Sequence, residues 1–462
     1  MSGVRTLRWH AGTLLLEGFP PEEVPDSFVW DPRVKLPRAP AHHYASVVWS
    51  LHQRGVPFVD EAKGFNRLAR EHQTARTPRD YQREAVDAWW RNRGRGMVIL
   101  PTGAGKSFVA ELCMAKANRH TLVVAPTLDL VSQWYEGLKR AFGGPIGLLG
   151  GGHHDLQDIT VSTYDSAWMH VEHWGNRFGL IVFDEAHHLP GPSFAQAAEY
   201  ALAPLRLGLT ATPERPDGAD AHLSTLVGPY VYRREITELA GDFLAPYRTE
   251  VLSVHLSSEE REAYEQARFT YRNFVDSSGL RLGGRGGWQR FLQASARSKA
   301  GREAFRAWRR SKQLLDAAPA KLRLLSELLY RHRDRRILIF TNDNATVYRI
   351  SRAFLVPAIT HRTDIKERRT LLSAFADGSM PTLVTSRVLN EGVDVPEADV
   401  AIVLSGTSTV REHVQRLGRI LRPREGKQAL LYELVVADSV EERTSQRRRD
   451  HAAYGADLEE PS

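Results

Sequence analysis

The sequence predicts an α/β protein with two lobes, each built on a mostly parallel sheet. Two observations lead to this prediction. Short apolar runs alternate with helical segments over residues 79–240, and the same rhythm resumes after residue 336, which is typical of repeated βαβ units. The length of 462 residues allows about three domains at roughly 150 residues each. We therefore expect two α/β lobes accompanied by smaller parts.

The expected strands are apolar runs that are too short for helices. In the first lobe they are residues 97–100, 122–125, 160–162, 180–183 and 205–209. In the second lobe they are residues 337–340, 382–385, 400–404 and 430–434. We expect each series to form a sheet of its own.

Composition divides the chain further. Residues 1–75 are expected to form a small N-terminal α+β domain, because residues 4–16 alternate like a hairpin and residues 42–53 have a helical pattern. A polar linker at 70–78 leads into the first lobe. We place the first lobe at 76–240, the second at 241–437 and a charged tail at 438–462.

Bulk properties exclude several classes of protein. An apolar content of 42% and a charged content of 25% are ordinary for a globular protein. No apolar run approaches the roughly 20 residues that a membrane span needs, and the N-terminus lacks a signal-peptide pattern. A single cysteine, Cys113, allows neither an internal disulfide nor a cysteine-cluster metal site. We expect a cytoplasmic protein with no membrane partner.

Basic residues are concentrated in one segment inside the second lobe, an insertion at about 262–313. Between Arg268 and Lys312 the net charge is +10, whereas the whole chain carries +7. Seven aromatic residues are interleaved: Phe269, Tyr271, Phe274, Trp288, Phe291, Phe305 and Trp308. This pattern indicates nucleic-acid phosphate contact, with aromatic rings that stack on bases or form a small local core. The alternative is a solvated basic helical hairpin packed by its own aromatic residues.

A glycine-rich turn follows the expected strand 97–100 and precedes a helical segment at 108–117. Such a turn directs backbone N–H groups and a helix N-terminus at one point, where a phosphate can bind. Lys106 is predicted to reach the β- and γ-phosphates of a nucleotide, and the Ser107 hydroxyl to bind Mg²⁺. The expected ATP-binding residues of the turn are Pro101, Thr102, Gly103, Ala104, Gly105, Lys106 and Ser107.

Two carboxylates, Asp184 and Glu185, end the strand expected at 180–183. Open α/β sheets bind their ligands at the carboxyl ends of the strands. Asp184 is therefore placed to hold Mg²⁺, and Glu185 to orient and deprotonate the attacking water. Together with the glycine-rich turn, this pair predicts hydrolysis of a nucleoside triphosphate.

Further residues complete the predicted site. Arg419 and Arg422 are three residues apart and share a helix face, from which guanidinium groups can stabilise charge on the γ-phosphate. Gln82, which follows Arg79 before the glycine-rich turn, can pair with the N6/N7 edge of adenine. We therefore expect Arg79 and Gln82 to select ATP.

The ordered set of motifs resembles that of the superfamily 2 helicases over nearly the whole chain. The set comprises residues 79–82, 100–107, 125–127, 162–164, 184–187, 210–212, 385 with 392–394, and 415–422. Within the superfamily, segments 161–167, 207–215, 356–363 and 416–423 most resemble the xeroderma pigmentosum group B (XPB) helicases in their compact archaeal and bacterial form. The resemblance implies two RecA-like helicase lobes, a thumb-like insertion, and 3′-to-5′ DNA helicase or translocase activity in DNA repair that uses ATP and Mg²⁺.

The resemblance also implies roles for individual residues. Gly392, Asp394 and Gln415 would join the ATP site. Contacts to a single-stranded/duplex DNA junction would come from Thr127, Thr163, His361, Arg362, Thr385 and, in the insertion, Arg281, Arg285 and Arg290. The family's Arg-Glu-Asp element, implicated in strand separation, is here Arg215, Pro216 and Asp217. Because proline fixes φ and lacks an N–H, unwinding is expected to be weaker or differently organised.

Two other functions remain open at this point. The chain could be a DNA-binding scaffold that delivers a partner nuclease to damaged sites, or a helicase that acts on RNA. A strand-separation assay distinguishes the first alternative, and ATPase stimulation by DNA or RNA distinguishes the second.

Overall fold

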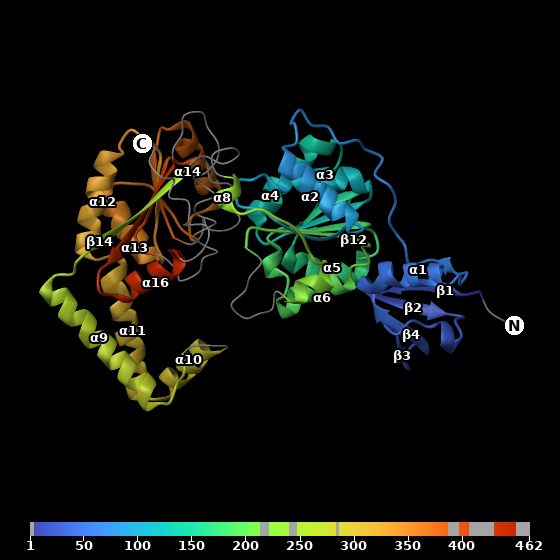
Figure 1. Ribbon diagram of the computed structural model, residues 1–462, viewed down its shortest axis with the longest axis horizontal. Helices are drawn as coiled ribbons and strands as arrows, with labels where there is room; N and C mark the ends of the chain where they lie inside the picture. The colour runs from blue at the N-terminus through green and yellow to red at the C-terminus, as the bar shows by residue number, and fades with distance from the viewer. Residues whose placement is uncertain are drawn as a thin grey trace. The chain divides into compact units, whose positions relative to one another are not determined.

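The structure, a computed structural model, describes residues 4–212, 221–239, 247–282, 286–386, 397–405 and 429–449. The chain forms two compact units, and the main boundary between them falls between Arg234 and Glu235 (Figure 1). The short segment Thr102–Ala104 is grouped with the second unit. The first unit holds the N-terminal domain and the first lobe. The second holds the second lobe and the basic insertion. Among the described residues, no helix combines the length and apolarity of a membrane span.

The N-terminal domain contains a five-stranded sheet in the order β3-β4-β2-β1-β5. Its elements are β1 (Thr6–His10), β2 (Thr13–Glu17), β3 (Val29–Asp31), β4 (Leu36–Pro40), α1 (Tyr44–Gln53) and β5 (Val59–Asp60). The first two strands form the predicted hairpin, with Thr6 opposite Glu17. At its turn Gly12 has φ +76°, and a Cβ there would lie 2.6 Å from the Tyr200 side chain of the first lobe. Glycine is therefore required where the hairpin meets the lobe.

The linker at 70–78 has no regular secondary structure, as its polar composition predicts, but it lies along the first lobe. Arg70 donates from Nη1 to the carbonyl oxygens of Gly143 (3.0 Å) and Pro145 (2.7 Å). The Gln73 amide donates to the Ala141 carbonyl at 2.6 Å. These bonds fasten the connection between the N-terminal domain and the lobe.

The first lobe is a parallel eight-stranded sheet, except at its edge strand β9, in the order β13-β6-β12-β11-β7-β10-β8-β9. Its strands are β6 (Arg95–Ile99), β7 (Thr121–Ala125), β8 (Gly147–Gly150), β9 (His153–Asp155), β10 (Ile159–Thr163), β11 (Leu180–Phe183), β12 (Leu205–Thr210) and β13 (Tyr230–Arg233). Its helices are α2 (Asp80–Arg91), α3 (Lys106–Ala117), α4 (Leu128–Phe142), α5 (Tyr164–Trp174), α6 (Pro192–Tyr200) and α7 (Ala221–Leu226). Helices α2, α3 and α4 cover one face of the sheet, and α5 and α6 cover the other (Figure 1).

A buried arginine on β12 holds part of this lobe together. Arg206 is fully buried and donates to the carbonyl oxygens of Ala198, Ala201, Ala203 and Leu226 at 2.6–3.1 Å. Burial lowers the pKa of its guanidinium, but a guanidinium stays charged in proteins. The four carbonyl dipoles therefore compensate a buried cation.

The second lobe is an all-parallel six-stranded sheet in the order β14-β19-β18-β15-β17-β16. Its strands are β14 (Tyr247–Val254), β15 (Ile337–Phe340), β16 (Ala358–Ile359), β17 (Thr382–Thr385), β18 (Val400–Val403) and β19 (Ala429–Val436). Its helices are α8 (Ile236–Leu239), α12 (Pro319–Arg331), α13 (Asn344–Phe354), α14 (Ile365–Asp377) and α16 (Val440–Arg449). The prediction of two parallel-sheet lobes is thus confirmed.

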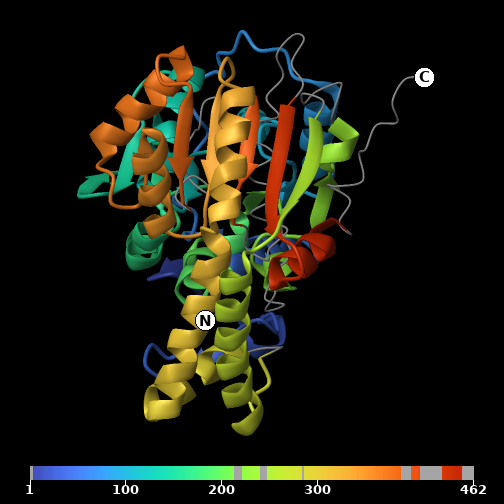
Figure 2. The ribbon, with the colours of Figure 1, turned by 90° about the vertical axis from the view of Figure 1, so that its left-hand side faces the viewer.

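The basic insertion is a helical projection that leaves the lobe after β14. It consists of α9 (Ser258–Ser277), α10 (Gly287–Arg297) and α11 (Lys299–Asp316), and α9 and α11 run side by side (Figure 2). Most of its aromatic residues pack into the small local core. Phe291 is fully buried, and its ring lies 5.1–6.5 Å from those of Tyr271, Phe274, Trp288 and Phe305.

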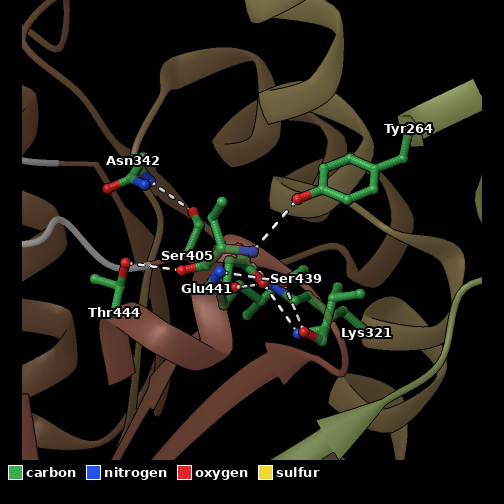
Figure 3. A network of polar contacts seen from close by, with 10 residues as sticks. Tyr264, Lys321, Asn342, Ser405, Ser439, Glu441 and Thr444 are labelled. Carbon is green, nitrogen blue, oxygen red and sulfur yellow. Dashed lines mark hydrogen bonds and ion pairs between the residues drawn. The ribbon is translucent and has the colours of Figure 1, made fainter. Parts of the chain in front are cut away.

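Polar contacts join the root of this insertion to the end of the lobe (Figure 3). Buried Lys321 donates to both carboxylate oxygens of Glu441, at 2.9 and 2.7 Å, and to the Leu404 carbonyl at 2.6 Å. The Val440 amide at the start of α16 donates to the Tyr264 hydroxyl of α9 at 3.3 Å. Helix α9 is therefore anchored to α16 at its base.

Asp316, the last residue of α11, provides a test of this network. Burial, and then the charge of Glu441, raise the pKa of its carboxyl to about 6, against opposing charges from Lys321 and Lys312. The folded state then binds a proton that the unfolded state releases, so stability falls as pH rises between about 4 and 6. Partial exposure limits this loss to about 2 kcal/mol.

We expect Asp316→Asn to remove that loss. As the pH rises from 4 to 7, the unfolding free energy of the variant should therefore gain about 2 kcal/mol relative to that of the wild type. Chemical unfolding followed across this pH range measures the difference. A difference that stays constant with pH would contradict the assignment.

Candidate active site

The glycine-rich turn lies between β6 and α3, as the sequence predicts. Gly103 and Gly105 have φ of 88° and 78°, values that glycine adopts at little cost. Gly105 is the N-cap of α3, so Lys106 is the first residue of the helix. The N-terminal turn of α3, with its unpaired N–H groups and positive dipole end, thus borders the glycine-rich turn.

Lys106 extends back over this turn. Its half-buried ammonium donates from Nζ to the Leu100 carbonyl at 3.3 Å, and Ser107 beside it is exposed. The Leu100 amide donates to the Thr210 carbonyl at the end of β12. The turn is therefore bonded to the neighbouring strand of the sheet.

Gln82 packs against the turn from α2. Its side chain is buried, and Oε1 accepts a hydrogen bond from the Arg79 amide at 3.0 Å. A Cβ at Gly105 would lie 2.7 Å from Nε2 of Gln82. The structure thus places both predicted adenine-selecting residues beside the glycine-rich turn.

Asp184 and Glu185 follow β11 directly. Because β6, β12 and β11 are neighbouring parallel strands, their carboxyl ends meet at one edge of the sheet. Glu185 has φ 46°, which is uncommon for a residue with a side chain. The left-handed conformation turns the chain sharply after the strand.

The Asp184 carboxylate is buried and held at both oxygens. Oδ1 accepts from the Glu185 amide at 3.0 Å, and Oδ2 accepts from the indole Nε1 of Trp134 at 2.8 Å. Burial raises the pKa of Asp184, while the Trp134 bond and the charge of Lys106 oppose this rise. Lys106 is thus close enough to Asp184 for their charges to interact.

A second contact ties the acidic turn to β12. His187 is buried, and its Nδ1 lies 3.1 Å from Oγ1 of Thr210 and 3.4 Å from Oε2 of Glu185. Thr210 also accepts from the amide of Thr212 at 3.2 Å. A contiguous set of polar contacts therefore connects the acidic turn to the 210–212 segment.

The predicted DNA-contact threonines of this lobe serve as helix caps. Oγ1 of Thr127 accepts from the Leu130 amide at the start of α4, at 3.3 Å. Oγ1 of Thr163 accepts from the Ser166 amide at the start of α5, at 3.1 Å, and Thr163 is buried. Thr163 is the last residue of β10, and Thr127 lies two residues after β7 of the same sheet.

The predicted residues of the second lobe differ in accessibility. His361 and Arg362 are exposed, and Nδ1 of His361 lies 3.0 Å from Nδ2 of Asn344. Thr385 is fully buried at the end of β17. Arg281 and Arg290 of the insertion are exposed. Eight predicted residues lie outside the described residues: Arg215, Asp217, Arg285, Gly392, Asp394, Gln415, Arg419 and Arg422.

Two aromatic residues contact the acidic turn, a role that the sequence did not predict, although Tyr164 belongs to the 162–164 motif. Trp134 bonds the Asp184 carboxylate, and the Tyr164 hydroxyl donates to the Asp184 carbonyl at 3.0 Å. Both lie on helices that begin just after the predicted threonines. Helical spacing places such residues on a buried face, but it does not reveal which carboxylate they reach.

Three family profiles match the chain. Residues 7–62 match the xeroderma pigmentosum group B helicase damage recognition domain. Residues 76–215 match the type III restriction enzyme res subunit, and residues 320–424 match the helicase conserved C-terminal domain. The matches follow the N-terminal domain, the first lobe and the second lobe in order.

Two solved structures resemble the chain at the level of the fold. The helicase domain of Hef from Pyrococcus furiosus has a TM-score of 0.53 at 21% identity, and the match covers 80% of this chain and 98% of that one. The Saccharomyces cerevisiae protein Dbp5, solved with RNA and ADP BeF3, has a TM-score of 0.56 at 15% identity over 83% of this chain and 89% of that one. Both support a fold with two RecA-like α/β lobes.

Relatives at higher identity extend over most of the chain. The DNA 3'-5' translocase XPB2 of Sulfurisphaera tokodaii is 44% identical over 80% of this chain and 84% of that protein. The DNA 3'-5' helicase XPB of Mycobacterium tuberculosis is 31% identical over 83% of this chain, which spans 65% of that protein. The chain belongs to the XPB family of superfamily 2 DNA helicases.

Proposed function

We propose that this chain hydrolyses ATP at the glycine-rich turn and acidic turn of the first lobe and uses the reaction to move along or open DNA. The chain is an ATP-dependent DNA helicase or translocase by family. The observation that carries the catalytic assignment is the common sheet edge. At this edge the glycine-rich turn follows β6, and the acidic turn with Asp184 and Glu185 follows β11. The charge of Lys106 acts on Asp184 there.

The residues present suit a magnesium nucleotide. The glycine-rich turn and the N-terminus of α3 provide N–H donors for phosphate oxygens, and Lys106 adds a cation. The exposed Ser107 hydroxyl and the Asp184 carboxylate are the oxygen ligands that Mg²⁺ prefers. When bound, Mg²⁺ neutralises charge on the β- and γ-phosphates.

Glu185 is the proposed general base. Its left-handed backbone and its 3.4 Å contact with His187 hold it beside Asp184. A carboxylate in this place can orient a water and accept its proton during attack on the γ-phosphate. His187 then links the hydrolytic group to Thr210, and through it to the 210–212 segment.

We propose that the second lobe completes the site. Arg419 and Arg422 would stabilise the charge that develops on the γ-phosphate, as arginine fingers do. Gly392, Asp394 and Gln415 would contact the nucleotide. The support for these five roles is the resemblance of their motifs to those of the family.

DNA contacts are proposed for both units. In the first lobe Thr127 and Thr163 mark helix N-termini, which attract phosphate, and Arg215 and Asp217 would act near the strand junction. In the second, His361 and Arg362 are exposed, whereas Thr385 is buried and would act through its neighbours. Arg281, Arg285 and Arg290 would use the positive field of the insertion.

The insertion makes a testable contribution to DNA affinity. Arg290 and Arg302 are both exposed on its helices, so reversing their charge leaves its aromatic core in place. We expect Arg290→Glu with Arg302→Glu to weaken DNA binding about tenfold and to reduce the slope of log affinity against log salt by about 2. Fluorescence anisotropy at several salt concentrations measures both quantities.

Arg333→Glu is the matched control, because Arg333 is an exposed arginine of the same unit outside the insertion. It should bind DNA like the wild type. Equal affinities of the double variant and the control would contradict a role of the insertion in DNA binding.

The alternative is a scaffold that brings a partner nuclease to damaged DNA. The damage-recognition match of residues 7–62 and Pro216 in the Arg215–Asp217 element favour it. A strand-separation assay on a 3′-tailed duplex decides between the two. ATP-dependent unwinding supports the helicase, whereas tight DNA binding without unwinding supports the scaffold.

A further inference from the structure

Trp134 reaches the proposed magnesium ligand from a different element of the first lobe. It lies on α4, two turns into the helix, while Asp184 follows β11. Its indole Nε1 donates to Oδ2 of Asp184 at 2.8 Å, and the two side chains are 5% and 6% exposed. This is a buried hydrogen bond to a charged acceptor, the stronger kind of hydrogen bond in proteins.

The two bonds to Asp184 fix the plane of its carboxylate. Oδ1 is held by the Glu185 amide, which belongs to the same turn. Oδ2 is held by Trp134, which belongs to a rigid helix. Without the indole N–H, the carboxylate could rotate about its Cβ–Cγ bond and leave the orientation that a metal ligand needs.

Helix α4 also carries one of the proposed DNA contacts. Its N-cap is Thr127, whose Oγ1 accepts from the Leu130 amide. A helix transmits displacement along its axis because its backbone hydrogen bonds keep it stiff. A shift of the Thr127 end of α4 therefore also moves the indole of Trp134 relative to Asp184.

We propose that Trp134 is a positioning residue, which holds the Asp184 carboxylate in its metal-binding orientation and links that orientation to the DNA-contacting end of α4. The inference rests on the proposed function, because it takes Asp184 as a magnesium ligand. Hydrogen bonds to ligating carboxylates from surrounding residues typically contribute 10- to 100-fold to metal affinity. The same contact could instead satisfy only a buried N–H, so the test must separate the two roles.

The lobe contains a matched control for that purpose. Trp89 is fully buried on α2, and its Nε1 donates to the Arg206 carbonyl at 2.9 Å. Trp89→Phe removes a buried indole hydrogen bond from the same lobe at a site with no carboxylate. Trp134→Phe removes the equivalent bond at Asp184, and Trp134→His keeps a ring N–H.

The first measurement is the affinity for ADP by calorimetry, with and without Mg²⁺, on the full chain. We expect Trp134→Phe to weaken the binding of ADP with Mg²⁺ about tenfold and to leave the binding of ADP alone unchanged. Trp89→Phe should leave the ratio of the two affinities at the wild-type value, and Trp134→His should restore part of the ratio. A wild-type ratio in Trp134→Phe overturns the positioning role.

The second measurement repeats the titration with single-stranded DNA present. If α4 links the two sites, DNA changes the affinity of the wild type for ADP with Mg²⁺ by some factor, because coupling between sites is reciprocal. In Trp134→Phe, DNA should change the affinity for ADP with Mg²⁺ by a factor closer to one. A factor unchanged by the substitution, or equal to one in the wild type, overturns the link to α4.

Failure of the proposed function gives a different result. In that case the wild type itself shows no preference for ADP with Mg²⁺ and no DNA-stimulated turnover. Should Trp134→Phe not fold, as judged by circular dichroism, Trp134→Met takes its place, because methionine fills irregular core space without an N–H. The ratio of its ADP affinities with and without Mg²⁺ then tests the positioning role of Trp134.

Discussion

Glu185→Gln is expected to reduce DNA-stimulated ATP turnover about 10³-fold while ATP still binds. The amide keeps the size and hydrogen-bonding capacity of the side chain but cannot accept the proton of the attacking water, and loss of a general base typically costs 10²- to 10⁴-fold. The backbone at Glu185 is fixed by its left-handed turn after β11, so the substitution leaves the position of Asp184 in place. Steady-state turnover and nucleotide affinity, measured on the same preparation, separate the two effects.

Glu172→Gln provides the control, since Glu172 is an exposed carboxylate on α5 of the same lobe. It should retain wild-type turnover. If Glu185→Gln also hydrolysed ATP at the wild-type rate, Glu185 would not be the base, and another group would have to activate the water.

Lys106→Ala is expected to reduce both nucleotide affinity and turnover, in contrast to Glu185→Gln. The ammonium lies over the glycine-rich turn and acts on Asp184, so its removal withdraws a cation from the proposed phosphate site. Removing one preorganised donor to a developing charge costs about 10²- to 10³-fold in turnover. Calorimetric titration with ADP and Mg²⁺ measures the loss of affinity independently of catalysis.

Lys116→Ala tests whether any lysine of α3 would have the same effect. Lys116 lies at the other end of the helix, where its Nζ is 2.7 Å from Oδ1 of Asp87 in an exposed pair. Exposed ion pairs contribute about 0–1 kcal/mol, so turnover should stay at the wild-type level. Comparable losses in the two variants would indicate a general effect on the lobe rather than phosphate binding.

Much of the core was predictable because its strands are continuous apolar runs. The run at 180–183 is β11 without change, and the run at 122–125 is β7 with Thr121 added. Edge elements were not predicted. Strand β13 spans only four residues and β16 only two. Both are defined by their pairing with a neighbouring strand, in which Tyr230 lies opposite Met97 and Ile359 opposite Thr385.

The site was predictable to the extent that its residues follow strand ends. Lys106 and Asp184 come together because parallel strands carry them to one edge of a sheet. Trp134 was not predicted, because its partner lies fifty residues away in sequence and a tryptophan on an amphipathic helix indicates only burial. The burial of Thr385 was not predicted either, because a threonine at a strand end can point to either side of the sheet.

For the insertion, charge and composition predicted DNA contact but left the role of the aromatic rings open. Its basic and aromatic residues predicted DNA contact together with two roles for the rings. The packing around Phe291 identifies the rings as a core, which leaves the exposed arginines as the groups available to phosphate. Phe269 (61% exposed) and Trp288 (38% exposed) keep accessible ring surface among the seven aromatic residues.

DNA should control ATP hydrolysis at the first-lobe site. The most direct test is the rate of ATP hydrolysis by the full chain without nucleic acid, with single-stranded, duplex and forked DNA, and with RNA. We expect a severalfold increase with DNA, a smaller one with RNA, and no DNA-stimulated rate in Glu185→Gln. A rate that is indifferent to DNA, or one that survives the Glu185→Gln substitution, would contradict this expectation.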